Sequence, residues 1–83
     1  MSLRDVFMSL VRDYAYSELK RGLLRDWRPE LVYNVIDEAL SEKIYEINSF
    51  LESYVVTLEN MNPAALRVAR EILIPYISKK RVQ

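Results

Sequence analysis

The side chains of this chain that could carry chemistry are carboxylates, arginines, lysines and tyrosines, because its 83 residues include no histidine and no cysteine. Those two side chains are the ones most used for proton transfer at neutral pH, for thiol chemistry and for binding transition metals. A single glycine also excludes a P-loop, a dinucleotide-binding motif and an EF-hand loop. A Ser–Lys pair is conceivable, but nothing in the sequence places one. We therefore expect a protein that is not an enzyme and that holds no metal or other cofactor.

The ionisable side chains are segregated along the chain although the net charge is zero. Residues 1–29 carry a charge of +2, residues 30–60 carry −6, and residues 61–83 carry +4. This separation of charge within a neutral chain favours a protein that binds other molecules, and it indicates where they could dock.

Carboxylates recur at four-residue spacing in the acidic middle of the chain, at Glu38, Glu42 and Glu46. On one helix they would repel one another slightly. The face is then either a solvated surface, or one that meets basic residues of neighbouring helices, or a docking site for a basic protein surface. A Mg²⁺ site is disfavoured, because such sites combine one or two carboxylates with substrate phosphate.

Basic side chains gather near the C-terminus. On an uninterrupted helix Arg67, Arg70 and Arg81 would project within about 60° of one another, flanked by Lys79 and Lys80. Such a stripe suits a nucleic-acid backbone or a carboxylate-rich protein, and an ordinary charged surface is the third interpretation.

Three apolar residues are candidate contacts for a protein partner. Trp27 stands among arginines in a connecting segment, where it is either an exposed anchor or a lid over the end of the bundle, with an arginine stacked on its ring. Tyr45 and Val56 project onto otherwise polar helix faces. Joined to uncovered apolar surface, they would mark a contact site.

The spacing of apolar residues predicts three helices, at about 3–21, 29–59 and 63–78. Ser2 and Asp5 are placed as a capping box for the first helix, which ends near Gly22. The second has the clearest apolar stripe, and a break at Ser41 is the main alternative to one long helix. Pro63 suits the first turn of the third helix, and Pro75 predicts a kink or an end near Leu73.

Short connections make successive helices antiparallel neighbours, so we expect a single all-α domain, an up-down-up three-helix bundle with a long central helix. Apolar surface left on that helix would be covered by a second copy or by another protein. No apolar run is long enough to span a membrane and no secretory signal is evident, so a cytoplasmic location is expected. The composition leans toward thermophilic proteins, although four asparagines and three methionines point the other way.

The chain is rich in Tyr, Ile, Arg and Glu, and it ends in a basic helix. In size and composition it resembles the small helical accessory subunits of crenarchaeal B-family DNA polymerases. The resemblance implies a non-catalytic subunit of a nucleic-acid-processing complex, which docks on a larger protein and contacts DNA through its C-terminal helix. The alternative is a self-associating structural module with no role at nucleic acid.

Overall fold

The computed structural model describes residues 2–81, and every regular element in that range is a helix, which confirms the all-α prediction. The last three elements, which are given below as α4, η1 and α5, follow one another without a break and form one rod. Residues 2–81 therefore form four helical rods. In chain order the elements are α1 (Leu3–Arg21), α2 (Pro29–Glu42), α3 (Ile44–Ser53), α4 (Met61–Val68), the π-helical turn η1 (Ala69–Leu73) and α5 (Ile74–Arg81).

The first helix begins and ends where the sequence indicates. Ser2 Oγ accepts a hydrogen bond from the Asp5 backbone N–H at 3.2 Å, and Asp5 Oδ2 accepts one from the Ser2 N–H at 3.3 Å. The two bonds form the predicted capping box and satisfy N–H groups that an α-helix leaves free at its start. Gly22 caps the other end.

The predicted single helix 29–59 is wrong, because the chain breaks at Lys43 into α2 and α3. In a continuous helix the Lys43 ammonium would lie in the apolar stripe. At the break it instead donates to Glu46 at 3.0 Å and lies 4.8 Å from the centre of the Tyr76 ring. The break costs few hydrogen bonds, since the Lys43 N–H still donates to Ala39 and the Lys43 carbonyl accepts from Ile47. The alternative break at Ser41 would have come two residues early.

The helical middle of the chain also ends earlier than expected, at Ser53. The following Tyr-Val-Val-Thr run is β-branched and aromatic, which lowers its helix propensity. Asn60 holds this loop in place, because its Oδ1 accepts from the Thr57 N–H at 2.7 Å and its Nδ2 donates to the Val55 carbonyl at 2.9 Å. A structured loop at 54–60 therefore replaces the last turns of the predicted helix.

The final rod runs from Met61 to Arg81, so it is longer at both ends than the predicted 63–78. Of the two alternatives at Pro75, a kink or an end near Leu73, the end is wrong, because the π-helical turn η1 carries the helix past Pro75. Proline has no N–H to donate to the preceding turn and clashes with its carbonyl. In η1 the Ile74 N–H reaches back five residues to the Ala69 carbonyl, and this widened turn accommodates Pro75.

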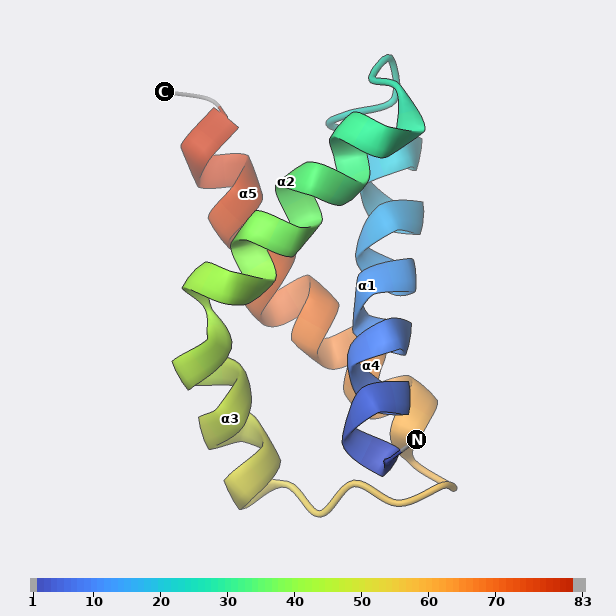
Figure 1. Cartoon of the computed structure of the whole chain (residues 1–83), viewed down its shortest axis with the longest axis vertical. Helices are drawn as coiled ribbons and strands as arrows, with labels where there is room; N and C mark the ends of the chain where they lie inside the picture. Colours follow the sequence, from blue (N-terminus) through green and yellow to red (C-terminus); the bar gives the residue numbers. More distant parts are fainter. Residues whose placement is uncertain (1, 82–83) are drawn as a thin grey trace.

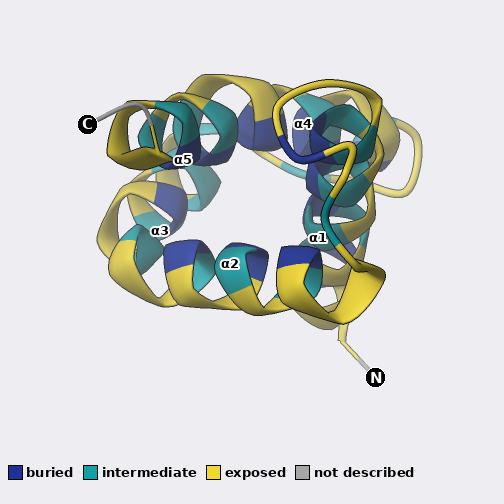
Figure 2. Cartoon of the chain, turned by 90° about the horizontal axis from the view of Figure 1, so that it is seen from above, coloured by how far each residue is buried: buried dark blue, intermediate teal, exposed yellow. Residues whose placement is uncertain are grey.

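The four rods surround one apolar core. Figure 1 shows α1 running in one direction, α2 and α3 returning, and the last rod running back from behind the start of α1, across and behind α2, to end at the level where α2 begins. The buried faces of all the helices point inward (Figure 2). Small residues line the contact of α1 with α4 and η1, where Ala15, Ala64, Ala65 and Ala69 are all buried. The large side chains of the core are Phe7, Val11, Leu19, Leu24, Val32, Ile36, Ile47, Met61, Val68, Leu73 and Ile77.

Candidate functional site

The basic residues predicted to face nucleic acid do not form one free stripe. Arg67 donates to Glu71 at 3.0 Å, Arg70 to Glu18 at 2.8 Å, and Lys80 to Glu38 at 3.2 Å. Lys79 has no ion-pair partner among residues 2–81. The projection of Arg70 and Arg81 onto one side assumed a regular α-helix, and η1 changes the number of residues per turn between them.

Arg81 lies on Trp27 instead of facing outward. Its guanidinium carbon is 5.3 Å from the centre of the indole ring. The Trp27 side chain is half-buried against the core, and Lys20 Nζ donates to the Trp27 carbonyl at 2.6 Å. Trp27 therefore closes the end of the bundle, with the stacking arginine supplied by α5 rather than by its own connecting segment.

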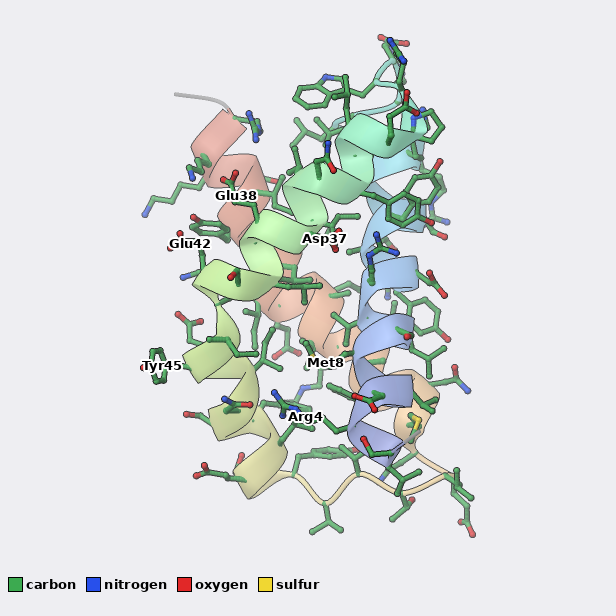
Figure 3. The ribbon with its side chains drawn as sticks, in the orientation of Figure 1. Arg4, Met8, Asp37, Glu38, Glu42 and Tyr45 are labelled. Carbon is green, nitrogen blue, oxygen red and sulfur yellow. The ribbon has the colours of Figure 1, made fainter. Side chains whose placement is uncertain are left out.

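The acidic ladder is divided between two helices by the break at Lys43. Glu38 on α2 pairs with Lys80 of α5, and Glu46 on α3 pairs with Lys43. Glu42 has no ion-pair partner in the described part of the chain. Figure 3 shows Glu38 pointing toward α5 and Glu42 pointing away from the bundle. Part of the ladder thus pairs across the bundle, which was one of the three interpretations of this face.

A second ion pair between helices joins α1 to α2. Arg12 donates to Asp37 through Nε at 2.8 Å and through Nη2 at 3.1 Å. Figure 3 shows Asp37 pointing from α2 toward α1. The hydrogen bond to Asp37 raises the pKa of Arg12, and the hydrogen bond to Glu38 raises the pKa of Lys80. Both pairs are solvent-exposed, so screening by water leaves each only a small contribution to stability.

The most exposed large apolar side chains lie on α3 and on the loop after it. Tyr45 is 85% exposed, Val55 79% and Leu58 78%, whereas the other exposed large apolar side chains of the described chain are below half. Figure 3 shows Tyr45 pointing away from the bundle, on the same side as Glu42. Glu52 lies seven residues after Tyr45, two helical turns along the same face of α3.

Carboxylates without an ion-pair partner in the described structure accompany these apolar side chains. We call these exposed residues of α2, α3 and the following loop the acidic–apolar face; they are Glu42, Tyr45, Glu52, Val55, Leu58 and Glu59. The one cation within residues 42–59, Lys43, already pairs with Glu46. The face therefore combines apolar surface with a charge of −3.

Val56, predicted to be an exposed contact, points inward. Beyond Ser53 the chain is extended, so neighbouring side chains alternate sides, and Val56 packs on the core while Val55 is exposed. With Leu3, Arg4, Phe7 and Leu51 it lines a groove of about 300 Å³ between α1 and the loop.

The sequence pattern missed Val55 and Leu58 as surface residues, because both fit the apolar stripe of a helix that does not continue past Ser53. The signal that could have exposed this error is the run of β-branched residues at 55–57. The sequence analysis also missed Glu18 and Arg21. Glu18 pairs with Arg70 across 52 positions of the chain, and the spacing of residues does not predict such a contact.

Within residues 2–81 no cluster of carboxylates has the arrangement of a metal site, and no helix there is long and apolar enough to cross a membrane. No protein-family model, curated protein or solved structure matches this chain.

Proposed function

We propose that this protein is a non-catalytic docking module, which binds a larger protein through its acidic–apolar face. The proposal rests on two kinds of exposed side chain that occur in the same segment of the chain. The three most exposed large apolar side chains and three carboxylates without ion-pair partners all lie within residues 42–59 of the described chain. Exposed apolar side chains mark a contact site where they form one surface, and the proposal assigns Tyr45, Val55 and Leu58 to such a surface.

The chemistry of the face defines its partner. Tyr45 supplies a large amphipathic ring of the kind enriched in binding hot spots. Glu42, Glu52 and Glu59 lie on the same stretch of the chain as the apolar side chains, so a complementary partner combines apolar surface with basic side chains. Two copies meeting through this same face would bring six carboxylates together, which disfavours a symmetric dimer there.

The fold supports a module that is stable before it docks. The accessible surface of 5419 Å² is close to the roughly 5,200 Å² expected of a compact 9.8 kDa monomer. Proteins that bind DNA have basic surfaces, and they are the class of partner that this face fits best. This agrees with an accessory role in a nucleic-acid-processing complex.

Direct contact with DNA is a separate part of the proposal, in which Arg67 and Lys80 would exchange their carboxylate partners on the chain, and Arg81 its contact with Trp27, for phosphates. Binding of DNA, measured by the protein alone and in complex, tests this part. A phosphate contact through these cations requires affinity that falls with salt. Salt-independent or absent binding would remove DNA contact from the proposal.

Self-association is the second candidate, favoured by the apolar groove between Leu3, Phe7, Leu51 and Val56. A second copy could cover that groove without joining the two acidic–apolar faces. Analytical ultracentrifugation at micromolar concentration separates the two candidates: a docking module sediments as a monomer, and a structural self-associating module as a dimer or larger species.

The main proposal is tested by capture of partners from the native source with wild-type protein and two variants. In the face variant Tyr45, Val55 and Leu58 are replaced by serine; in the control variant Leu23 and Leu31, which are 44% and 45% exposed, are replaced by serine. We expect the face variant to lose the partner and the control variant to keep it. Equal capture by all three proteins would refute docking through this face.

A charge variant refines the test. Replacing Glu42, Glu52 and Glu59 by glutamine should slow association with the captured partner and flatten its dependence on salt, because rim charges act mainly on the association rate. An association rate and a salt dependence equal to those of wild type would mean that the partner does not recognise the negative charge.

A further inference from the structure

A second groove, of about 630 Å³, lies between α1 and the start of the last rod. Tyr14 and Leu66 contribute apolar surface to it, and both are half-buried. Its charged side chains are Glu18, Lys20 and Arg21 of α1 and Arg70 of η1, of which Lys20 donates to the Arg25 and Trp27 carbonyls. The groove shares no residue with the acidic–apolar face.

Two arginines converge on one carboxylate oxygen in this groove. Glu18 Oε1 accepts from Arg21 Nη2 at 2.8 Å, from Arg70 Nη2 at 2.8 Å and from Arg70 Nε at 3.1 Å. The hydrogen bond from Arg70 lowers the pKa of Glu18, so the carboxylate stays ionised. One carboxylate therefore pairs with two guanidinium groups, and Glu18, Arg21 and Arg70 together have a net charge of +1.

The two arginines have donors left for a ligand. A guanidinium has five N–H groups, and only three of the ten on Arg21 and Arg70 donate to Glu18. Both side chains are open to solvent, 70% exposed for Arg21 and 56% for Arg70, while Glu18 is only 25% exposed. An incoming anion would thus meet the arginines before it met Glu18.

We propose that this groove binds an acidic peptide segment of a partner protein. A carboxylate of the segment would lie between Arg21 and Arg70, in the two-donor geometry that arginine forms with carboxylates, and an adjacent apolar side chain would pack on Tyr14 and Leu66. Glu18 already occupies part of this position, so the chain itself shows that the arginines hold a carboxylate.

The groove fits a peptide better than a nucleic acid. Arg21, Arg70 and Glu18 together carry a net charge of +1, which matches a single carboxylate better than a continuous phosphate backbone with a charge on every nucleotide. The aromatic rings nearby are partly engaged. Tyr16 is stacked on Tyr33 with ring centres 4.3 Å apart, and the Tyr14 hydroxyl donates to Asn62 at 2.8 Å. These contacts restrict the base stacking on which single-stranded nucleic acid depends.

The inference goes beyond the proposed function and does not depend on it. If both hold, the protein has two docking surfaces of opposite charge, and it could join a basic partner at α3 to an acidic segment at α1 and η1.

The test is a titration of the isotopically labelled full chain with a short synthetic peptide rich in glutamate and leucine, followed by NMR. We expect shifts of the amide signals of Ser17, Glu18, Arg21, Leu66 and Arg70 that saturate with peptide. Arg70→Gln and Arg21→Gln should each weaken the affinity about tenfold, the usual scale for a hydrogen bond to a charged group. Arg67→Gln is the matched control, because Arg67 lies on the same rod but pairs with Glu71.

Glu18→Gln gives the most specific readout. Removing the internal carboxylate frees both arginines, so this variant should bind the acidic peptide several-fold more tightly than wild type. A groove in which Arg21 and Arg70 are only structural would show no such gain. Titration with a basic peptide and with a single-stranded oligonucleotide completes the experiment. Absence of saturable shifts at the groove, weaker binding by Glu18→Gln, or binding of the oligonucleotide in place of the acidic peptide would overturn the proposal.

Discussion

Ile47 and Leu58 belong to one predicted apolar stripe, but replacing each by alanine should lower the stability of the protein by very different amounts. In a continuous helix 29–59, Ile47 and Leu58 lie eleven residues apart and share the buried face. The structure buries Ile47 completely and leaves Leu58 78% exposed. Ile47→Ala removes a fully buried side chain and should cost about 3 kcal/mol. Leu58→Ala removes a side chain with roughly a fifth of its surface buried, which is worth about 0.5 kcal/mol.

These free energies convert into readily measured shifts of melting temperature. Unfolding entropies near 2.1 cal/mol/K per residue give roughly 170 cal/mol/K for 83 residues. Ile47→Ala should therefore lower Tm by about 17 °C and Leu58→Ala by about 3 °C. Thermal unfolding followed by far-UV circular dichroism, with urea unfolding as a check on the free energies, measures both. A loss of Tm for Leu58→Ala equal to that for Ile47→Ala would mean that the middle helix does continue through the loop, and the acidic–apolar face would not exist as described.

Three further predictions concern the ion pair at Glu18, the loop and the core. The folded-state pKa of Glu18 lies below its ordinary value of 4.5, so its pairing with Arg70 stabilises the fold above that pH and is lost as the pH falls through the folded pKa. Glu18→Gln should therefore lower Tm at neutral pH and approach wild type below pH 4.5; a constant difference at all pH values would contradict this linkage. Asn60→Ala removes the side chain that holds the loop and should cost about 1 kcal/mol, with faster amide hydrogen exchange at Thr57, whose N–H donates to Asn60; unchanged exchange there would show that the loop does not depend on Asn60. Ala65→Leu inserts a large side chain where α1 and α4 meet closely and should destabilise by about 1–3 kcal/mol in urea unfolding, so a neutral result would indicate looser packing than described.

The features that the sequence predicted well depend on local chemistry. The first helix has a capping box at Ser2 and Asp5 and a glycine at its end, and these residues fix its limits without help from the rest of the molecule. The start of α2 follows from Pro29 in the same way. The apolar periodicity of the chain was sufficient to predict an all-α fold.

The structural features that could not be predicted from the sequence depend on contacts between residues that are distant in the chain. Lys43 would lie in the apolar stripe of a continuous helix, and at the break its ammonium contacts Glu46 and also Tyr76, a residue of another rod that the spacing does not reveal. The π-helical turn before Pro75 keeps the last helix intact where local rules predict its end. Both cases show tertiary packing overriding a local preference.

The predicted site residues lie in different parts of the molecule. Glu42 and Tyr45 are exposed on α2 and α3, whereas Val56 packs partly buried on the core and Trp27 closes the end of the bundle. Of the basic residues of the last rod, Arg67 pairs with Glu71 one helical turn away, whereas the partners of Arg70 and Lys80 come from α1 and α2. The spacing of residues predicts the helix face on which a charged side chain lies. It does not predict which oppositely charged residue of another helix will pair with it.

The central claim is that the acidic–apolar face docks on a basic partner, and cross-linking at Tyr45 tests it most directly. A photoreactive phenylalanine analogue at position 45 of the full chain, activated in an extract of the native source, should join the protein to a partner with a basic surface. The same group at Asn34, an exposed position on α2, should give no such product. Equal cross-linking from both positions, or a product formed only between copies of this chain, would contradict the claim.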